Sequence, residues 1–271
     1  MTNRKIKWLL LCLLILNIIL VSKLKSDALN NSPLDEFEKQ ISCYNCYDKD
    51  SLNLYYQKYQ ESYSIEYVLN SINFPEFYDY NTISPAITCN NIILVNRKYY
   101  VGATYIPDSL VDIGDIPKIH RENEIILLDK QTLEAYTRMV HDATFEGIEL
   151  TVFSGYRSYT RQEELFTHGN DPMYIAMAGH SEHQTGLAID VSTKDTGLTS
   201  YFENTLSFHF LKNNAYKYGF ILRYPKDKTE ITGYGYEPWH YRYVGVEVAK
   251  YIYENNLTLE EYIYNYTIIN A

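Results

Sequence analysis

Two short segments of the 271-residue chain carry the residue types that metal hydrolases use. His183 precedes a glycine turn, and Asp190 follows inside an apolar stretch, where a bare carboxylate is costly to bury unless it is paired or bound to a metal. Further along the chain, His240 ends the segment Glu237-Pro238-Trp239-His240. Two imidazoles and one carboxylate suit a divalent ion such as zinc and leave a fourth tetrahedral position for water. The pattern therefore predicts a metal site of the open, catalytic kind.

Glu237 is the carboxylate that remains as a proton carrier. It can take a proton from a water activated by such an ion and hand it to a leaving amine. Pro238 prevents a regular helix across this segment, so the helical zinc-protease motif is excluded. From spacing alone, two plainer interpretations stay open. His183 and Asp190 could form a structural hydrogen-bonded pair, and His240 could be a packed core histidine.

The residues around Asp190 also fit a known family pattern. The series Ser181, His183, Gly186, Ala188 and Asp190 reads Ser-x-His-x-x-Gly-x-Ala-x-Asp, and Glu237 with His240 reads Glu-x-x-His. Together they resemble the signature of the VanY-type zinc D-alanyl-D-alanine carboxypeptidases. These belong to the LAS metallopeptidase superfamily, with the D-Ala-D-Ala dipeptidases and the hedgehog signalling domain. The resemblance runs from about residue 89 to about residue 256 and includes 154–158, Gln162, 218–220, 223–225 and 237–245.

The resemblance implies a role for each site residue. His183, Asp190 and His240 would hold one Zn²⁺ per chain, and Glu237 would be the general base and acid. Arg157 matches the family arginine that stabilises the developing negative charge or holds the substrate carboxylate, for which a guanidinium fork suits better than lysine. The remaining substrate-binding candidates are Gln162, Ser181 and Trp239, the last as a wall of the cleft.

Mixed strands and helices must position these residues. Strands are expected at 91–95 and 99–103, paired with each other, and at 149–153, 187–192 and 241–244. Helices are expected at 129–146 and 207–218, and capping boxes at Thr160/Glu163 and Thr258/Glu261 open two more. Because the order shows no strict βαβ alternation, we predict an α+β domain with a small antiparallel sheet flanked by helices.

The amino terminus predicts export. Basic residues flank an apolar run from Trp8 to Val21, which we interpret as a signal anchor spanning residues 1–25. Residues 26–81 are a polar tether and a short helical spacer, and residues 82–271 are the zinc carboxypeptidase domain. Cys43-x-x-Cys46 is a weak zinc signal, because no second Cys or His pair stands at matching spacing, and a disulfide outside the membrane is the open alternative. Since Cys89 makes the number of these cysteines odd, none of them receives an assigned role.

The net charge of the chain argues against nucleic acid as a partner. The chain has 24 Lys+Arg and 34 Asp+Glu, a net charge of −10 that repels nucleic acid. We expect a bacterial, single-pass membrane protein whose extracytoplasmic domain removes terminal D-alanine from peptidoglycan stem peptides or precursors. The alternatives are an L,D-carboxypeptidase that trims tetrapeptides and a non-catalytic wall-binding module with structural zinc.

Overall fold

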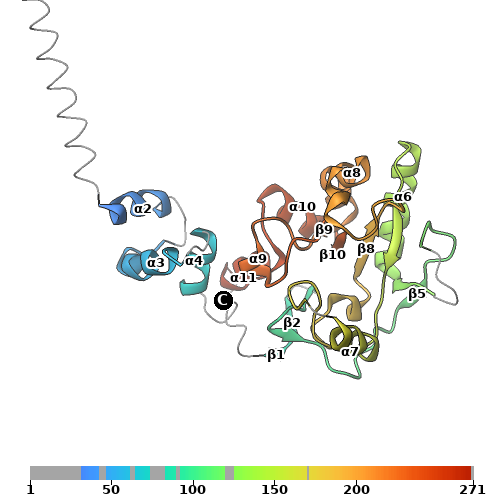
Figure 1. Ribbon diagram of the computed structural model, residues 1–271, viewed down its shortest axis with the longest axis horizontal. Coiled ribbons are helices and arrows are strands. Elements are labelled where there is room, and N and C mark those ends of the chain that lie inside the picture. The colour runs from blue at the N-terminus through green and yellow to red at the C-terminus, as the bar shows by residue number, and fades with distance from the viewer. Residues whose placement is uncertain are drawn as a thin grey trace, which may run out of the picture. The chain divides into compact units, whose positions relative to one another are not determined.

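The structure is a computed structural model that describes residues 32–42, 47–61, 65–73, 83–89, 92–119, 125–169 and 171–269 (Figure 1). The chain divides into two compact units, with the boundary after Asn73. The predicted anchor and the Cys43/Cys46 pair lie outside the described residues, and the predicted division at residue 82 stays a prediction. No helix in the described part of the chain is long and apolar enough to cross a membrane.

The first unit is helical. Its elements are α2 (Pro33–Ile41), the short 3-10 helix η1 (Lys49–Ser51), α3 (Leu52–Tyr59) and α4 (Ile65–Asn73). Ser32 and Asp35 form a capping box at the start of α2, each accepting a hydrogen bond from the other's backbone N–H. A small core holds the helices together and consists of Phe37, Ile41, Tyr55, Val68 and Leu69.

The second unit is built on a four-stranded sheet in the order β7-β8-β10-β9. All neighbours are antiparallel. The strands are β7 (Thr151–Ser154), β8 (Ala188–Ser192), β9 (Phe220–Leu222) and β10 (His240–Tyr243). The predicted α+β class with small sheets is therefore confirmed.

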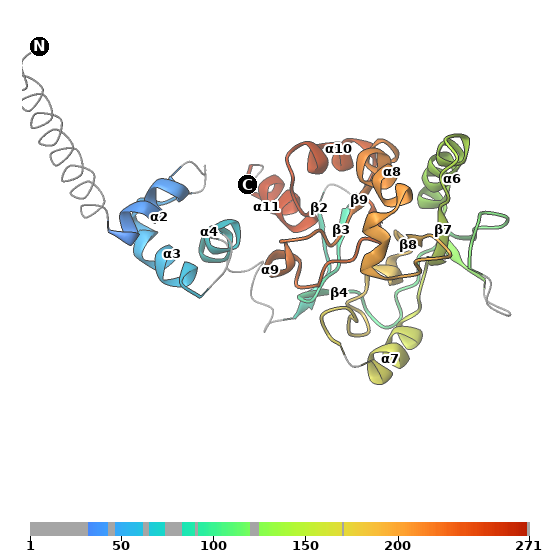
Figure 2. The ribbon, with the colours of Figure 1, turned by 45° about the horizontal axis from the view of Figure 1, so that its top comes forward.

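Helices cover one face of this sheet. The main helices are α6 (Lys130–Phe145), α8 (Leu206–Asn214) and α10 (Val246–Glu254), and Figures 1 and 2 show α6 and α8 alongside the strands. Ile189 and Val191 of β8 and Tyr241 of β10 enter the same core as Tyr136 and Met139 of α6. Side chains of neighbouring strand residues point to opposite faces. Asp190, next to Ile189 and Val191, and His240, next to Tyr241, therefore point away from this core. The core thus fixes which face carries the site.

The remaining elements surround the sheet. Three two-stranded pairs are β1 (Ser84–Pro85) with β4 (Tyr99–Tyr100), β2 (Ile87–Cys89) with β3 (Ile92–Leu94), and β5 (Leu110–Asp112) with β6 (Leu127–Asp129). The other helices are α7 (Tyr159–His168), η2 (Glu182–Thr185), η3 (Ser200–Asn204), η4 (Ala215–Tyr218), α9 (Thr229–Thr232) and α11 (Leu259–Ile269).

The predicted pairing of 91–95 with 99–103 is wrong. β3 pairs with β2 instead, and β4 pairs in parallel with β1. The Asn96 side chain accepts hydrogen bonds from the backbone N–H groups of Lys98 and Tyr99. This Asx-type turn supplies the local hydrogen bonds, so the two strands are free to find other partners.

One predicted capping box is confirmed and the other is wrong. Thr258 and Glu261 exchange side-chain to backbone hydrogen bonds at the start of α11, as expected. Helix α7, however, begins at Tyr159, with Ser158 in place of Thr160 as its N-cap, accepting from the backbone N–H of Arg161. Ser158 takes this role because the preceding backbone is tied down, with the N–H of Arg157 donating to the carbonyl of His183.

Gly186 ends η2, and replacing it with alanine should make the folded protein less stable. Its φ is +71°, and an added Cβ would lie 2.9 Å from the Leu110 side chain and 3.1 Å from the Asp129 nitrogen. We expect Gly186→Ala to lower the free energy of unfolding by at least about 2 kcal/mol, from backbone strain plus crowding. Gly197→Ala, with φ +56° and open space around the new methyl, is the matched control and should cost about 1–2 kcal/mol. Urea unfolding compares the two, and equal losses would contradict the crowding argument.

Candidate active site

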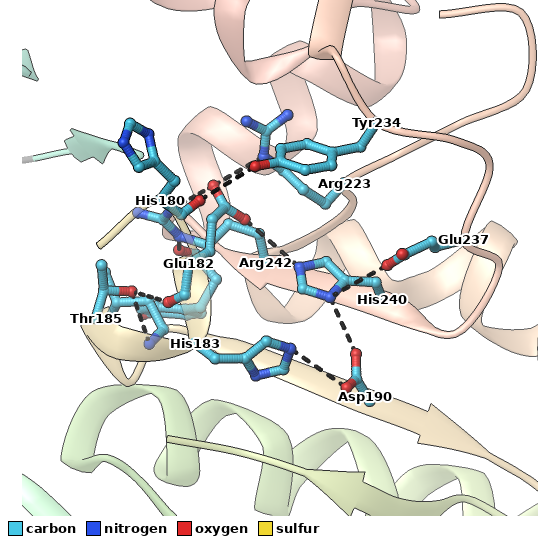
Figure 3. A network of polar contacts seen from close by, with 12 residues as sticks. His180, Glu182, His183, Thr185, Asp190, Arg223, Tyr234, Glu237, His240 and Arg242 are labelled. Carbon is cyan, nitrogen blue, oxygen red and sulfur yellow. Dashed lines mark hydrogen bonds and ion pairs between the residues drawn. The ribbon is translucent and has the colours of Figure 1, made fainter. Parts of the chain in front are cut away.

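The three predicted metal ligands lie close together on the face of the sheet that points away from the helix-covered core. His183 comes from η2, Asp190 from β8 and His240 from β10, where strand pairing sets His240 directly across from Asp190. All three are buried, and one ligand atom from each lies within 4.8 Å of the others. Figure 3 shows both imidazoles directed at the Asp190 carboxylate, at 3.2 Å from His183 Nε2 and 3.0 Å from His240 Nδ1.

Each imidazole has a separate partner on its other nitrogen. Nδ1 of His183 donates to the Gly155 carbonyl oxygen at 2.7 Å, which leaves Nε2 as the nitrogen that faces Asp190. His240 is turned the other way, with Nδ1 facing Asp190 and Nε2 lying 3.6 Å from a Glu182 carboxylate oxygen. The two histidines therefore present different ring nitrogens to the same point.

The electrostatics of this point favour a cation. Burial opposes ionisation of Asp190, but the interactions of its carboxylate with His183 and His240 outweigh burial and hold the pKa of Asp190 well below its usual range. Burial also lowers the pKa of His183, which keeps that imidazole in the neutral form that binds metals. For His240, burial is outweighed by the carboxylates of Asp190 and Glu182, which raise its pKa to about 9. Once a metal ion displaces the proton from His240, two nitrogen donors and one carboxylate held at this spacing fit zinc.

Glu237 lies beside the ligands without being one of the close trio. Its carboxylate is 3.7 Å from His240 Nδ1, and it sits in the turn that leads into β10. Burial, the largest influence, raises the pKa of Glu237 to about 8. A carboxyl group that titrates near neutral pH is well matched to accepting and returning a proton.

Arg157 lies close to Asp190 and is held there by two hydrogen bonds. Its guanidinium donates to the Gln162 side-chain oxygen at 2.9 Å and to the Ser154 hydroxyl at 3.0 Å, and lies 3.9 Å from Asp190. Gln162 in turn donates to the carbonyl of Ala176 at 2.6 Å. In this structure Gln162 orients Arg157 and anchors the 171–179 segment.

A cavity of about 230 Å³ joins these groups. All eight residues predicted from the sequence line it, including Ser181 and Trp239, so the structure brings the whole predicted set together. The other half of the wall was not among the predicted site residues and consists of Leu165, Tyr174, Ile175, Ala176, Glu182, Leu198, Tyr224 and Tyr234. The Tyr224 ring stacks on His240, with ring centroids 4.8 Å apart. Tyr224 lies in one of the family-like segments, so that signal could have found it.

A buried ion network stands behind His240. One Glu182 oxygen accepts from Arg223 Nε at 2.8 Å and from Arg242 at 2.7 Å. Arg223 also forms a two-point pair with Glu260 at 2.9 and 2.6 Å, and Asn96 donates to Glu260 at 3.0 Å. The four charged side chains are at most 1% exposed. Their charges cancel, which is the condition under which such a cluster can be buried.

The chain is similar to proteins of a known family over the segment that holds the site. Residues 125–246 match the family VanY, described as D-alanyl-D-alanine carboxypeptidase, and this span contains all eight predicted site residues. YodJ of Bacillus subtilis, which carries a provisional carboxypeptidase name, is 44% identical over 183 residues, covering 64% of this chain and 67% of YodJ. The chain belongs to the VanY carboxypeptidase family. As a member of that family it is an enzyme, as predicted. It spans about 57–67% of the length of the first curated relatives it matches.

Solved structures of VanY-type peptidases share the fold. The LD-carboxypeptidase LdcB is 39% identical with a TM-score of 0.58, and the match covers 68% of this chain and 94% of LdcB. A variant of the vancomycin-resistance D,D-pentapeptidase VanY, solved in complex with Zn(II), is 35% identical with a TM-score of 0.51, covering 63% of this chain and 97% of that one. Zinc in this second structure agrees with the donor set found here.

Proposed function

We propose that this chain is a zinc D,D-carboxypeptidase that hydrolyses the terminal D-alanyl-D-alanine bond of peptidoglycan stem peptides or precursors. The observation that carries the proposal is a single cavity in which the buried His183–Asp190–His240 centre faces both Glu237 and Arg157. The family description and the D,D-pentapeptidase relative support the substrate class.

The side chains divide the chemistry between them. Zinc, when held by the three ligands, polarises the scissile carbonyl and lowers the pKa of a water molecule. The Glu237 carboxylate accepts the proton of the attacking water and returns it to the departing amine of D-alanine. Arg157 offers its guanidinium either to the negative charge that develops on the carbonyl oxygen or to the terminal carboxylate of the substrate.

Arg157→Lys should impair hydrolysis severely. A single ammonium cannot hold both Ser154 and Gln162 while also presenting a donor to the substrate. We expect kcat/KM to fall by about 10²–10³-fold, the usual loss when one donor to a developing oxyanion is removed. Arg161→Lys, in the helix α7 that follows Arg157, is the matched control, because the Arg161 side chain is 61% exposed and bonds only to Glu164 among the contacts described. Wild-type kinetics for Arg157→Lys would contradict its assigned role.

The substrate proposal is tested with two synthetic stem peptides. The full-length protein, loaded with zinc, is incubated with a pentapeptide that ends in D-Ala-D-Ala and with the corresponding tetrapeptide, and the products are measured by mass spectrometry. We expect loss of one D-alanine from the pentapeptide. Removal of the last residue from the tetrapeptide alone would overturn the D,D assignment.

An L,D-carboxypeptidase is the second candidate. LdcB, an LD-carboxypeptidase, supports it with 39% identity. The two-peptide assay separates the candidates, since they differ in which peptide is shortened. A binding module with structural zinc is disfavoured by Glu237, because a site that only holds metal has no use for a proton carrier.

We also propose that residues 1–25 tether the enzyme to the cell membrane, with the catalytic domain on the extracytoplasmic side, where the substrate lies. The basic-flanked apolar run of the sequence supports this placement. Expression in a bacterial host followed by membrane fractionation and external protease treatment tests it. Recovery of the intact chain in the soluble cytoplasmic fraction would overturn it.

A further inference from the structure

We propose that Glu182 is a positioning residue that selects the ring nitrogen with which His240 binds zinc. Glu182 is adjacent in sequence to one ligand, His183, yet its side chain faces the other ligand. The remaining Glu182 oxygen and His240 Nε2 are both fully buried and lie 3.6 Å apart. Among the described residues neither atom has a hydrogen-bond partner within normal bonding distance, and the two atoms face each other (Figure 3). Each is therefore the nearest group that could satisfy the other.

The pairing determines the form of the imidazole. A neutral imidazole has one N–H donor and one acceptor nitrogen. Nδ1 hydrogen-bonds to Asp190 at 3.0 Å, and it can bind zinc only after it has given up that proton. The one remaining ring proton must then lie on Nε2, and because an ionised carboxylate can only accept, Glu182 favours this tautomer. A carboxylate behind a ligand histidine also fixes the ring orientation and raises its basicity.

The Glu182 carboxylate is itself held in place. Arg223 and Arg242 both bond to its other oxygen, and Arg242 additionally donates to the carbonyl of Ile93 at 2.7 Å. The two guanidinium groups bonded to Glu182 supply positive charge directly beside its carboxylate. Glu260 balances the second positive charge. Asn96, Ile93 and Glu260 all lie outside the span that matches the family, so flanking segments of the chain complete this support.

The test compares zinc affinity in two variants that each remove one buried carboxylate from the network. In Glu182→Gln, the amide oxygen stays with the two arginines and the amide N–H group turns to His240. Nε2 must then accept, the proton moves to Nδ1, and zinc binding weakens. We expect a 10–100-fold loss of zinc affinity in competition with a chromophoric chelator, the usual effect of removing such a partner. Glu260→Gln is the control, because it also disturbs Arg223 but does not contact His240.

Three readouts separate positioning from general stability. Glu260→Gln should lower the unfolding midpoint while leaving zinc affinity and the visible spectrum of the Co²⁺-substituted protein unchanged. Glu182→Gln should change both the zinc affinity and the Co²⁺ spectrum. Equal losses of affinity in the two variants, or wild-type affinity in Glu182→Gln, would overturn the proposal.

If Glu182→Gln does not fold, Glu182→Asp keeps the charge but withdraws the carboxylate by one methylene. It should bind zinc more weakly than wild type, and wild-type affinity in the folded Asp variant would overturn the proposal.

The inference rests on the zinc centre of the proposed function, but its measurement needs no peptide. A wild-type protein that binds zinc and cleaves neither stem peptide would defeat the proposed function and leave the affinity comparison intact. A wild-type protein that binds no zinc would defeat both.

Discussion

Glu237→Ala should leave a folded protein that retains zinc and hydrolyses stem peptides about 10²–10⁴-fold more slowly, the range that a general base contributes. Glu237 is not one of the three closely grouped ligands, so its loss removes the proton carrier and keeps the metal site. The loss should appear in kcat, because proton transfer occurs only as the bond breaks.

The measurement combines metal analysis with steady-state kinetics on the pentapeptide. Glu247→Ala is the control, since Glu247 is exposed at the start of α10 and outside the cavity. Hydrolysis at the wild-type rate would show that Glu237 has no catalytic role. Loss of zinc together with activity would make Glu237 part of the metal site instead.

Asp190→Ala should abolish zinc binding. Asp190 supplies the only carboxylate among the three ligands, and it lies 3.9 Å from the Arg157 guanidinium. Without Asp190, the uncompensated positive charge of Arg157 faces the two histidines and repels a cation. The two imidazoles alone also provide too few ligands for a stable tetrahedral site.

Metal analysis of the purified protein checks this result. Asp195→Ala removes the same charge from an exposed position in the turn after β8 and should leave the zinc content unchanged. Asp190→Ala protein that retains zinc through gel filtration in the presence of a chelator would contradict the ligand assignment.

The site was predictable because its chemistry is concentrated in short segments. Ligands and base lie in two runs, 181–190 and 237–240, and the buried aspartate in an apolar strand is visible without a structure. The strand periodicity also indicates that Asp190 and His240 face away from the core. Their direct pairing across β8 and β10 could not be read from the sequence, because register depends on long-range contacts.

The buried ion network beside His240 could not be predicted from the sequence for the same reason. Glu182 meets Arg223 41 positions later, and Asn96 meets Glu260 across 164 positions. No local pattern announces such pairs. Likewise, Ser158 and Thr160 are both suitable N-cap residues, and only the anchored backbone before α7 decides between them.

Because Glu182, Arg223, Arg242 and Glu260 form one neutral buried cluster, substitutions at these four distant positions are expected to depend on one another. Breaking a buried ion pair by removing one partner typically costs about 3–5 kcal/mol, a large part of a domain's total stability. Change at one of these positions is therefore tolerated only with compensating change at another. A chimera that takes residues 125–246 from a relative must bring a partner for Glu260 of this chain, or exchange the carboxy-terminal helix as well.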